Sequence, residues 1–425
     1  MQGFRCAPMD EVRVGLIGLG GRGSHALERL QTIPGVRIVA ICDCEEDRVA
    51  ENAAKLKAAG VSGFKSFTGS KEAWKGLCEL DSVDAVYIAT SWQVHAQMGS
   101  YALRSGKHAF IEVPSAMTID ECWELVEESE RSRRHCMQLE NCLYGEAECL
   151  ALAMCRERMF GELLYGECGY LHDRRRSIFN GIHRDHWRMK WNIAHRGDQY
   201  PTHGLGPICQ CMDVNRGDSL DFLVSVDTKQ AGYEAYAARK YPGDWRASLK
   251  FKTGDATFTT IRTANQRVIV IKHDTTSPRP YSRINRLQGT SGVIEGQTES
   301  PSWPLRIMFD GEGDGWENAW LDQEAVERIR REHMHPLWKR AGELARKEGG
   351  HGGMDYLMDA RWSYCLRKGL PLDTDVYDLA TWCSVCELSE RSVLSGSAPQ
   401  KFPYFTRGAW KTAKPLPLAD IEIEA

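Results

Sequence analysis

The stretch Arg13–Thr32, RVGLIGLGGRGSHALERLQT, decides the fold of the first part of the chain. It combines a short apolar strand pattern, a turn with the spacing G-x-G-x-x-G, and a helix pattern with apolar residues at helical intervals. In such a turn the first glycine permits the bend, the second lets the backbone approach a pyrophosphate, and the third lets helix and strand pack closely. The helix N-terminus would supply N–H donors to the phosphates. The predicted cofactor-binding residues of this turn are Gly18, Gly20, Gly21, Arg22 and Gly23.

The residues that follow this turn agree with a dinucleotide-binding domain. Val36–Cys42 is a second apolar strand pattern, and it ends at Asp43, 20 residues after Gly23. A carboxylate at that point binds a ribose 2′-hydroxyl and repels a 2′-phosphate, which favours NAD over NADP; the alternative is a solvated turn residue. Two more strand patterns, Asp84–Ala89 and His108–Val113, each follow a helical segment. This alternation predicts a doubly wound parallel sheet.

The segment Thr90–His95, TSWQVH, follows the third of these strands. Ligands bind at the carboxyl edge of such a sheet, so Trp92 and His95 are candidate cofactor contacts. Each is equally well explained as a core or helix-start residue. Glu112, at the end of the last strand pattern, is a further candidate cofactor contact.

The remainder of the chain is typical of an α+β domain with a large, open, mostly antiparallel sheet. We expect a domain of residues 1–135 with the Rossmann fold, an α+β substrate domain of residues 136–400, and a C-terminal tail of residues 401–425. The predicted strands of the second domain are Glu162–Asp173, Leu220–Thr228, Trp245–Thr253, Ala256–Ala264, Arg267–His273 and Ser291–Glu295, and its predicted helices include Ala147–Phe160, Gln323–Lys347 and Met354–Lys368.

Composition excludes several classes of partner. The 425 residues carry a formal net charge of −4, so we expect neither nucleic-acid nor membrane binding, and we interpret the run Arg174–Arg176 as solvated surface. The 15 cysteines are dispersed and odd in number, which indicates free thiols in a reducing compartment. Cys383-x-x-Cys386 has no second such pair, so we expect no zinc site there and no metal elsewhere. The N-terminus lacks the apolar segment of a signal peptide; we expect a cytoplasmic protein, with an exported precursor as the alternative.

The motifs of the first domain, taken in order, resemble the Gfo/Idh/MocA oxidoreductase superfamily. They are the glycine-rich turn, Asp43, Thr90–His95 and Glu112-Val113-Pro114. Most dehydrogenases of that group have lysine where this chain has Val113, and the lysine assists proton transfer from a substrate hydroxyl. Valine can neither donate nor accept a proton, so the usual dehydrogenase catalyst is missing.

Motifs of the second half make the resemblance narrower. Over roughly residues 12–410 the chain resembles glycoside hydrolase family 109, the NAD-dependent α-N-acetylgalactosaminidases. The resemblance implies a redox-neutral hydrolysis with retention: tightly held NAD takes hydride from C3, the C2 proton is removed, the glycosidic oxygen leaves, water adds, and the hydride returns. The motifs that carry the resemblance are Leu139–Tyr144, Cys168–Asp173, Trp187-Arg188, Tyr200–Gly204 and His351–Asp355.

Five residues are candidate catalysts. Period-two spacing places Tyr170 and His172 on one face of a strand, where they are able to relay protons; a pair without function is the alternative. We expect His203 to be the main proton-transfer residue, on a turn that enters a helix starting near Gly206, and Tyr200 to assist it. The resemblance implies that His351 is the acid for the leaving group. The alternative for His203 is a structural cap residue, and the alternative for His351 is an incidental residue of a flexible loop.

Three residues are candidate sugar contacts: Glu140, Arg188 and, with a looser match to the family, Tyr281. His183 and His186 have the spacing i, i+3 but lack an evident third ligand, so we interpret them as surface or supporting residues and not as metal ligands.

Two other functions stay open at this point: a sugar or inositol dehydrogenase that uses external NAD, and a non-catalytic NAD-binding sensor. The partner we expect is a small molecule or glycan with terminal N-acetylgalactosamine, although β-linked or other acetamido sugars are alternatives. The superfamily resemblance also implies a homodimer as one assembly state.

Overall fold

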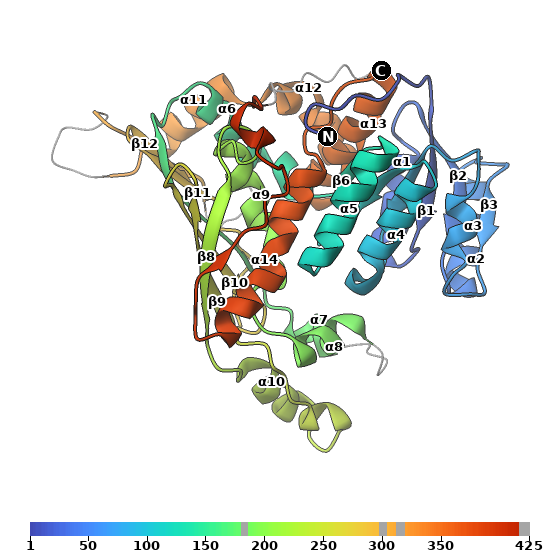
Figure 1. Cartoon of the computed structure of the whole chain (residues 1–425), viewed down its shortest axis with the longest axis horizontal. Coiled ribbons are helices and arrows are strands. Elements are labelled where there is room, and N and C mark those ends of the chain that lie inside the picture. The colour runs from blue at the N-terminus through green and yellow to red at the C-terminus, as the bar shows by residue number, and fades with distance from the viewer. Residues whose placement is uncertain (180–185, 297–303, 312–318, 416–425) are drawn as a thin grey trace. The chain divides into compact units, whose positions relative to one another are not determined.

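The computed structural model describes residues 1–179, 186–296, 304–311 and 319–415. The chain forms two compact units, which are coloured by residue number in Figure 1. The first contains residues 1–145 and 336–383, and the second contains residues 146–335 and 384–415. This division differs from the predicted boundaries, because a late segment joins the first unit. The reason is packing: Trp362 of this segment stacks on Phe110 with ring centroids 4.1 Å apart.

The first unit has the predicted doubly wound sheet. Six parallel strands lie in the order β3-β2-β1-β4-β5-β6, so the strand order reverses between β1 and β4. The carboxyl edge at such a reversal is where dinucleotides bind in this fold. The strands are β1 Val12–Ile17, β2 Val36–Cys42, β3 Lys65–Phe67, β4 Ala85–Ile88, β5 His108–Ile111 and β6 Cys136–Gln138. The helices are α1 Gly21–Leu30, α2 Glu46–Ala58, α3 Trp74–Cys78, α4 Trp92–Arg104, α5 Ile119–Ser132, α12 Pro336–Glu348 and α13 Met354–Lys368.

The second unit contains the predicted large open sheet. Eight strands lie in the order β13-β12-β11-β7-β10-β9-β8-β14, and all neighbours are antiparallel except β7 and β10. The strands are β7 Leu163–Leu171, β8 Leu220–Asp227, β9 Ala256–Thr263, β10 Val268–Asp274, β11 Arg286–Gly289, β12 Gly292–Glu295, β13 Arg306–Phe309 and β14 Gln400–Lys401. Its helices are α6 Glu146–Arg156, α7 Arg175–Phe179, α8 Trp187–Ala194, α9 Thr202–Cys211, α10 Gly232–Lys240 and α11 Gln323–His333, and α14 Val376–Leu394 spans the boundary between the units.

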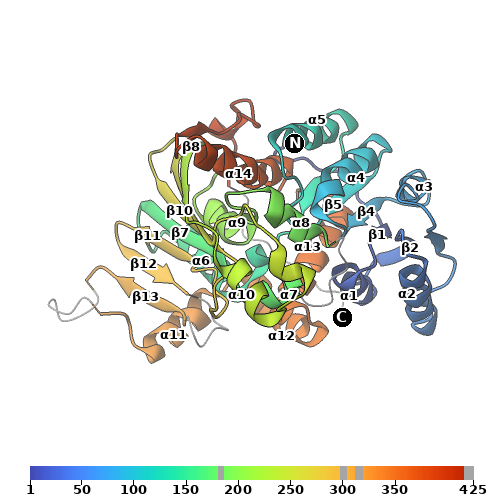
Figure 2. The same ribbon diagram turned by 90° about the horizontal axis from the view of Figure 1, so that it is seen from below.

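Helix α9 packs directly on strand β7, as Figure 2 shows. A Cβ atom on Gly204 would lie 2.5 Å from the Gly169 nitrogen, so only glycine lets the two backbones approach this closely. The helix begins at Thr202, earlier than the predicted start near Gly206, and Pro207 lies within it rather than in its first turn. This close contact sets the first turn of α9 beside the end of β7.

Two other predicted elements are wrong. The segment Trp245–Thr253 is not a strand: it contains a short 3-10 helix, η2 Trp245–Ser248, whose N-terminus is capped by the Asp244 carboxylate. The expected single helix Gln323–Lys347 is two helices, because Pro336 begins a new helix and cannot continue the one before it.

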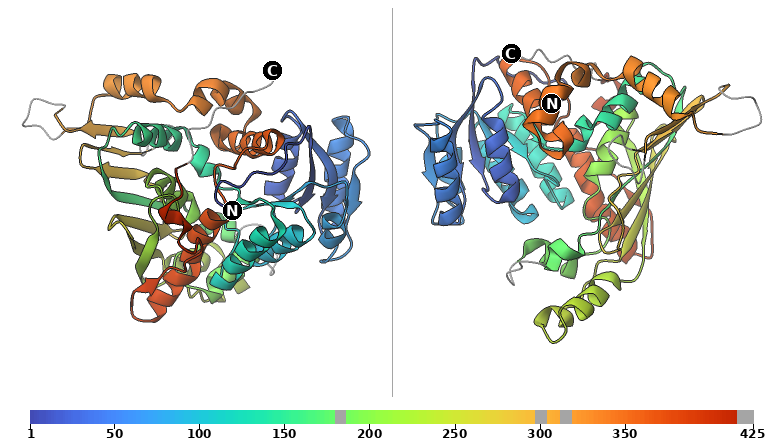
Figure 3. Two further views of the ribbon diagram at one scale, coloured as in Figure 1. Left: turned by 45° about the horizontal axis from the view of Figure 1, so that its top comes forward. Right: turned by 180° about the vertical axis from the view of Figure 1, so that it is seen from behind.

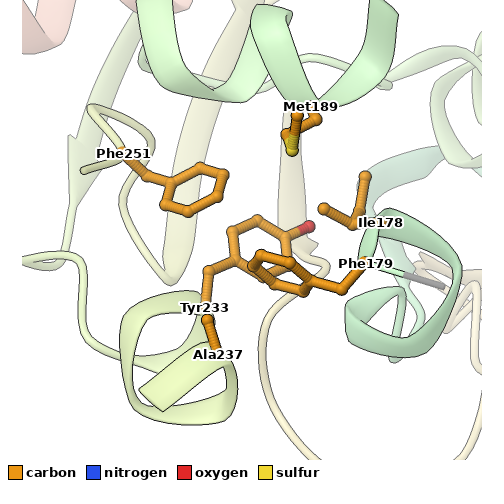
Figure 4. Packing of buried hydrophobic residues seen from close by; sticks show 6 residues of the cluster. All are labelled: Ile178, Phe179, Met189, Tyr233, Ala237 and Phe251. Carbon is orange, nitrogen blue, oxygen red and sulfur yellow. The ribbon is translucent and has the colours of Figure 1, made fainter. Parts of the chain in front are cut away.

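An apolar cluster explains the first of these differences and fixes three small helices. Figure 4 shows its six buried residues, Ile178, Phe179, Met189, Tyr233, Ala237 and Phe251. Trp245 and Leu249 pack against the cluster instead of entering the sheet. The cluster joins α7, α8 and α10, which gather at one end of the second sheet (Figures 1 and 3).

All 15 cysteines are free thiols, and most are buried. Within the described ranges, no helix has the length and apolar character needed to cross a membrane.

Candidate active site

The glycines of the glycine-rich turn are of two kinds: some are required by the fold, and others face open space. Gly18 has φ +91°, and a Cβ on Gly23 would lie 1.7 Å from the Gly18 carbonyl oxygen. By contrast, a Cβ on Gly20 would lie 3.8 Å from the Arg48 Nη1, and one on Gly21 would meet nothing within 4 Å. This open space at the N-terminus of α1 is a cradle that fits a pyrophosphate.

Asp43 is held rigidly at the carboxyl end of β2. Its side chain is 6% exposed, and its two oxygens accept the backbone N–H groups of Leu19, at 2.7 Å, and Glu45, at 3.0 Å. Arg48 lies 3.7 Å away. A buried, oriented carboxylate of this kind is not a solvated turn residue, and it fits the ribose-binding position of the fold.

Arg22 and Glu112, both expected to contact the cofactor, bind each other. The Arg22 Nε donates to the Glu112 Oε1 at 2.6 Å, while its Nη1 and Nη2 donate to the two oxygens of Asp355 at 2.6 and 3.1 Å. Tyr87 also donates to Glu112. The side chain of Arg22 therefore links the glycine-rich turn to α13.

Asp355 is a residue that the sequence prediction missed. It also accepts from the Asn141 Nδ2 at 2.7 Å and contacts the His351 Nδ1 at 2.8 Å. Burial raises the pKa of this carboxyl, but the His351 contact and the charges of Arg22 and Arg29 outweigh it and hold the pKa well below the usual range. The signal in the sequence was the spacing i, i+4 between His351 and Asp355.

His351 lies in a loop in which five successive residues, 349–353, have positive φ. The glycines around it tolerate this conformation, and His351 itself adopts φ +47°. Its side chain is 60% exposed, and its Nδ1 is turned toward Asp355. The loop is therefore tightly wound, and an exposed imidazole is anchored on a buried carboxylate.

Three other predicted residues of the first unit are buried. The two ring nitrogens of His95 face the carbonyl oxygens of Pro114 and Thr90, at 2.7 and 3.1 Å, and the residue is 1% exposed. This environment fits the alternative interpretation of His95 as a core residue. Trp92 begins α4 and is 4% exposed. Glu140 is fully buried, and its Oε1 accepts the Cys142 N–H.

In the second unit, four of the predicted catalytic residues form one cluster. The Tyr170 hydroxyl lies 3.0 Å from the His172 Nδ1, and the ring of Tyr170 lies 4.5 Å from that of Tyr200. Tyr200 in turn approaches the His203 Nε2 with its hydroxyl at 3.5 Å. The two phenols thus lie between the two imidazoles, along a short path from β7 to the first turn of α9.

The protonation of His172 follows from its surroundings. Burial, then the charges of Arg174 and Arg188, lower the pKa of His172 to about 4. The ring is therefore neutral at pH 7, so one of its nitrogens carries a proton and the other is an acceptor. The imidazole is thus able to accept a proton at one nitrogen as the other nitrogen releases one.

The predicted sugar contacts of this unit lie at the same cluster. Tyr281 meets His172 edge-on at 4.9 Å, and its hydroxyl accepts from the Arg283 Nη1. The Arg188 guanidinium lies over the Tyr200 ring at 5.5 Å. His186 caps α8, its Nδ1 accepting the Met189 N–H, whereas His183 lies outside the described residues.

The fold of the first unit and the fit of its cradle define the class of protein. Residues 12–139 match the model of the oxidoreductase family with an NAD-binding Rossmann fold. Residues 144–412 match the C-terminal domain of glycosyl hydrolase 109. The chain belongs to glycosyl hydrolase family 109.

Relatives of the chain support the family, and solved structures share its fold. A glycosyl hydrolase family 109 protein of Solibacter usitatus is 44% identical over 98% of this chain and 93% of its own length. One from Bacteroides thetaiotaomicron is 45% identical over 95% of the chain and 86% of its own length. The fold is similar to that of a levoglucosan dehydrogenase in complex with NADH and levoglucosan (TM-score 0.69, 16% identity, 92% of this chain and all of the other covered). It is also similar to an oxidoreductase domain protein from Kribbella flavida (TM-score 0.72, 16% identity, 93% and 100% covered).

Proposed function

We propose that this family member hydrolyses α-N-acetylgalactosaminides with retention of configuration, holding NAD tightly and using it without net consumption. The observation that carries the proposal is the cluster of Tyr170, His172, Tyr200 and His203, because it supplies proton-transfer groups where a two-carboxylate hydrolase would need an acid pair. When bound, NAD supplies a reversible hydride acceptor for a sugar carbon.

The residues that would hold the cofactor are those of the cradle. Gly20 and Gly21 leave open space where a pyrophosphate would lie, the N–H groups at the start of α1 would bind it, and Asp43 would accept from the adenosine ribose. The buried side chain of Val113 offers no proton-transfer group, in contrast to the lysine of typical dehydrogenases.

Proton transfer is assigned to the second unit. His203 is the base for the sugar, and Tyr200 is its hydrogen-bond partner. The neutral His172 is the hydrogen-bond partner of the Tyr170 hydroxyl, and Arg188 and Tyr281 bind and orient sugar hydroxyls or the acetamido carbonyl. In the first unit, Asp355 holds the ring of His351, the proposed acid for the leaving group, and Glu140 is the remaining proposed sugar contact.

The test is an assay of purified protein on p-nitrophenyl α-N-acetylgalactosaminide without added cofactor. The proposal expects nitrophenol release with no net rise in absorbance at 340 nm. A sugar-dependent rise at 340 nm that requires external NAD would instead support the sugar dehydrogenase, which is the second candidate. A panel of other aryl glycosides, including β-linked ones, then defines the range of sugars.

The proposal also includes a cytoplasmic location and a homodimer. The free thiols are consistent with a reducing compartment. Cell fractionation and sedimentation analysis test these two points.

A further inference from the structure

The three consecutive arginines 174–176, predicted to be solvated surface, differ from one another in the structure. Arg175 pairs with Asp173 at 2.8 Å, and Arg176 is exposed. Arg174 is half-buried, and its Nε is buried without a hydrogen-bond partner. Among the residues that the structure describes, its side chain takes part in no ion pair. Only Arg176 therefore fits the surface interpretation in full.

Arg174 lies beside the candidate catalytic cluster. It is two residues beyond His172, and both backbone N–H groups donate to the segment that ends β10, to Asp274 and Thr275. The charges of Arg174 and Arg188 both act on His172 and on His186, whose pKa values they lower in addition to burial. The two arginines therefore share one neighbourhood, in which Arg188 also lies over the Tyr200 ring.

The nearby carboxylates already have partners. Asp173 is bound by Arg175 through two of its nitrogens. Asp274 accepts the N–H groups of Thr276 and Ser277 and lies 3.7 Å from Arg279. Within the described part of the chain, the neighbourhood of Arg174 thus has an excess of positive charge. Such an excess, next to a donor that lacks an acceptor, favours a ligand that brings negatively charged oxygens.

The position of Arg174 is also held in place by the fold. The carbonyl of Arg174 accepts from Ile178 at the start of α7, and Ile178 belongs to the apolar cluster of Figure 4. On the other side of the same cluster, Met189 anchors α8, which carries Arg188. The fold therefore fixes the backbone of both arginines before any ligand arrives.

We propose that Arg174 is a specificity residue that binds a sulfate or carboxylate group carried by the glycoside, so that the enzyme prefers acidic glycosides. The planar guanidinium matches two oxygens of either group, which is a geometry that lysine cannot reproduce. This inference rests on the proposed glycosidase function, and it adds to that function the chemical class of the substrate.

The kinetic test compares matched substrates in three proteins. The first pair is p-nitrophenyl α-N-acetylgalactosaminide, which is neutral, and its 6-sulfate, which carries the charge on the sugar. The second pair is the methyl ester of the 4-hydroxybenzoate glycoside, which is neutral, and the free acid, which carries a carboxylate on the leaving group. Wild type is expected to show a higher kcat/KM for one acidic substrate than for its neutral partner. Arg174→Gln should lower kcat/KM on that acidic substrate by about 10- to 100-fold and change the neutral one less than about threefold. Arg176→Gln, the exposed neighbour, should change neither.

Other outcomes overturn the inference. Equal losses on acidic and neutral substrates in Arg174→Gln would show a structural role, and equal kcat/KM values on all pairs in wild type would show that no acidic group is recognised. If no glycoside is cleaved, the proposed function fails, and inorganic sulfate then decides the anion site. Sulfate should raise the melting temperature of wild type and Arg176→Gln above that in chloride at equal ionic strength, and this rise should be clearly smaller in Arg174→Gln, where only the general stabilising effect of sulfate is left. The same rise in all three proteins would contradict the assignment.

Discussion

Replacing Gly20 with alanine should separate cofactor binding from folding. Gly20 has φ −67° and ψ −172°, a conformation open to alanine, and its added Cβ would lie 3.8 Å from the Arg48 Nη1. The substitution should therefore leave the dinucleotide-free fold intact and stabilise it by about 0.4–1 kcal/mol, because alanine restricts the unfolded chain. The same methyl group would occupy the cradle. Forcing a methyl into a packed contact costs about 1–3 kcal/mol, which weakens NAD binding by roughly 5- to 150-fold.

The assay is a titration of dinucleotide-free protein with NAD, followed by tryptophan fluorescence, together with thermal unfolding of the same samples. Gly23→Ala is the contrasting variant: its Cβ would lie 1.7 Å from a backbone oxygen, so it should lower the melting temperature without any ligand. An unchanged NAD affinity in Gly20→Ala, with the fold intact, would refute the assignment of the cradle.

Three further substitutions address the catalytic cluster, the Asp355 network and acid stability. His203→Ala should keep NAD bound and lower kcat by about 10²- to 10⁴-fold, and full turnover would remove His203 from the mechanism. Asp355→Asn removes one of the two carboxylates that pair with the Arg22 guanidinium. It should lower the free energy of unfolding in urea by about 3–5 kcal/mol, and an unchanged value would show that the network contributes little. Burial, then the charge of Arg134, lower the pKa of His135 to about 4 in the folded state. As the pH falls from about 6.5 to 4, the unfolded chain takes up the proton first. The free energy of unfolding should therefore fall by about 3 kcal/mol over that range. His135→Phe should lose less stability over that range, and an identical pH profile would contradict this reasoning.

The sequence was sufficient to predict the features that depend on local pattern. The glycine-rich turn and Asp43 lie on neighbouring strands of one parallel sheet, so their spacing in the chain determines their positions in the fold. The pairing of Tyr170 with His172 followed from period-two alternation, which every strand obeys. His203 and Tyr200 were proposed from the helix-entry pattern together with the family resemblance, and Tyr281 from a looser match to the family; their contacts with Tyr170 and His172 come from the fold.

Features that depend on distant partners were not predictable in the same way. Asp355 is 333 residues from Arg22, and nothing local in either segment reports their ion pair. Trp245–Thr253 has the composition of a strand, but its apolar residues pack on three small helices that the pattern did not reveal. The buried Nε of Arg174 is likewise a property of the fold, because a run of three arginines is typical of solvated surface.

The most direct measurement of the central claim is hydrolysis of p-nitrophenyl α-N-acetylgalactosaminide in D₂O, with the released sugar analysed by mass spectrometry and NMR. If oxidation at C3 activates the neighbouring C–H bond, the sugar should carry solvent deuterium at C2 while no net NADH accumulates. Complete hydrolysis with only hydrogen at C2 would contradict the account.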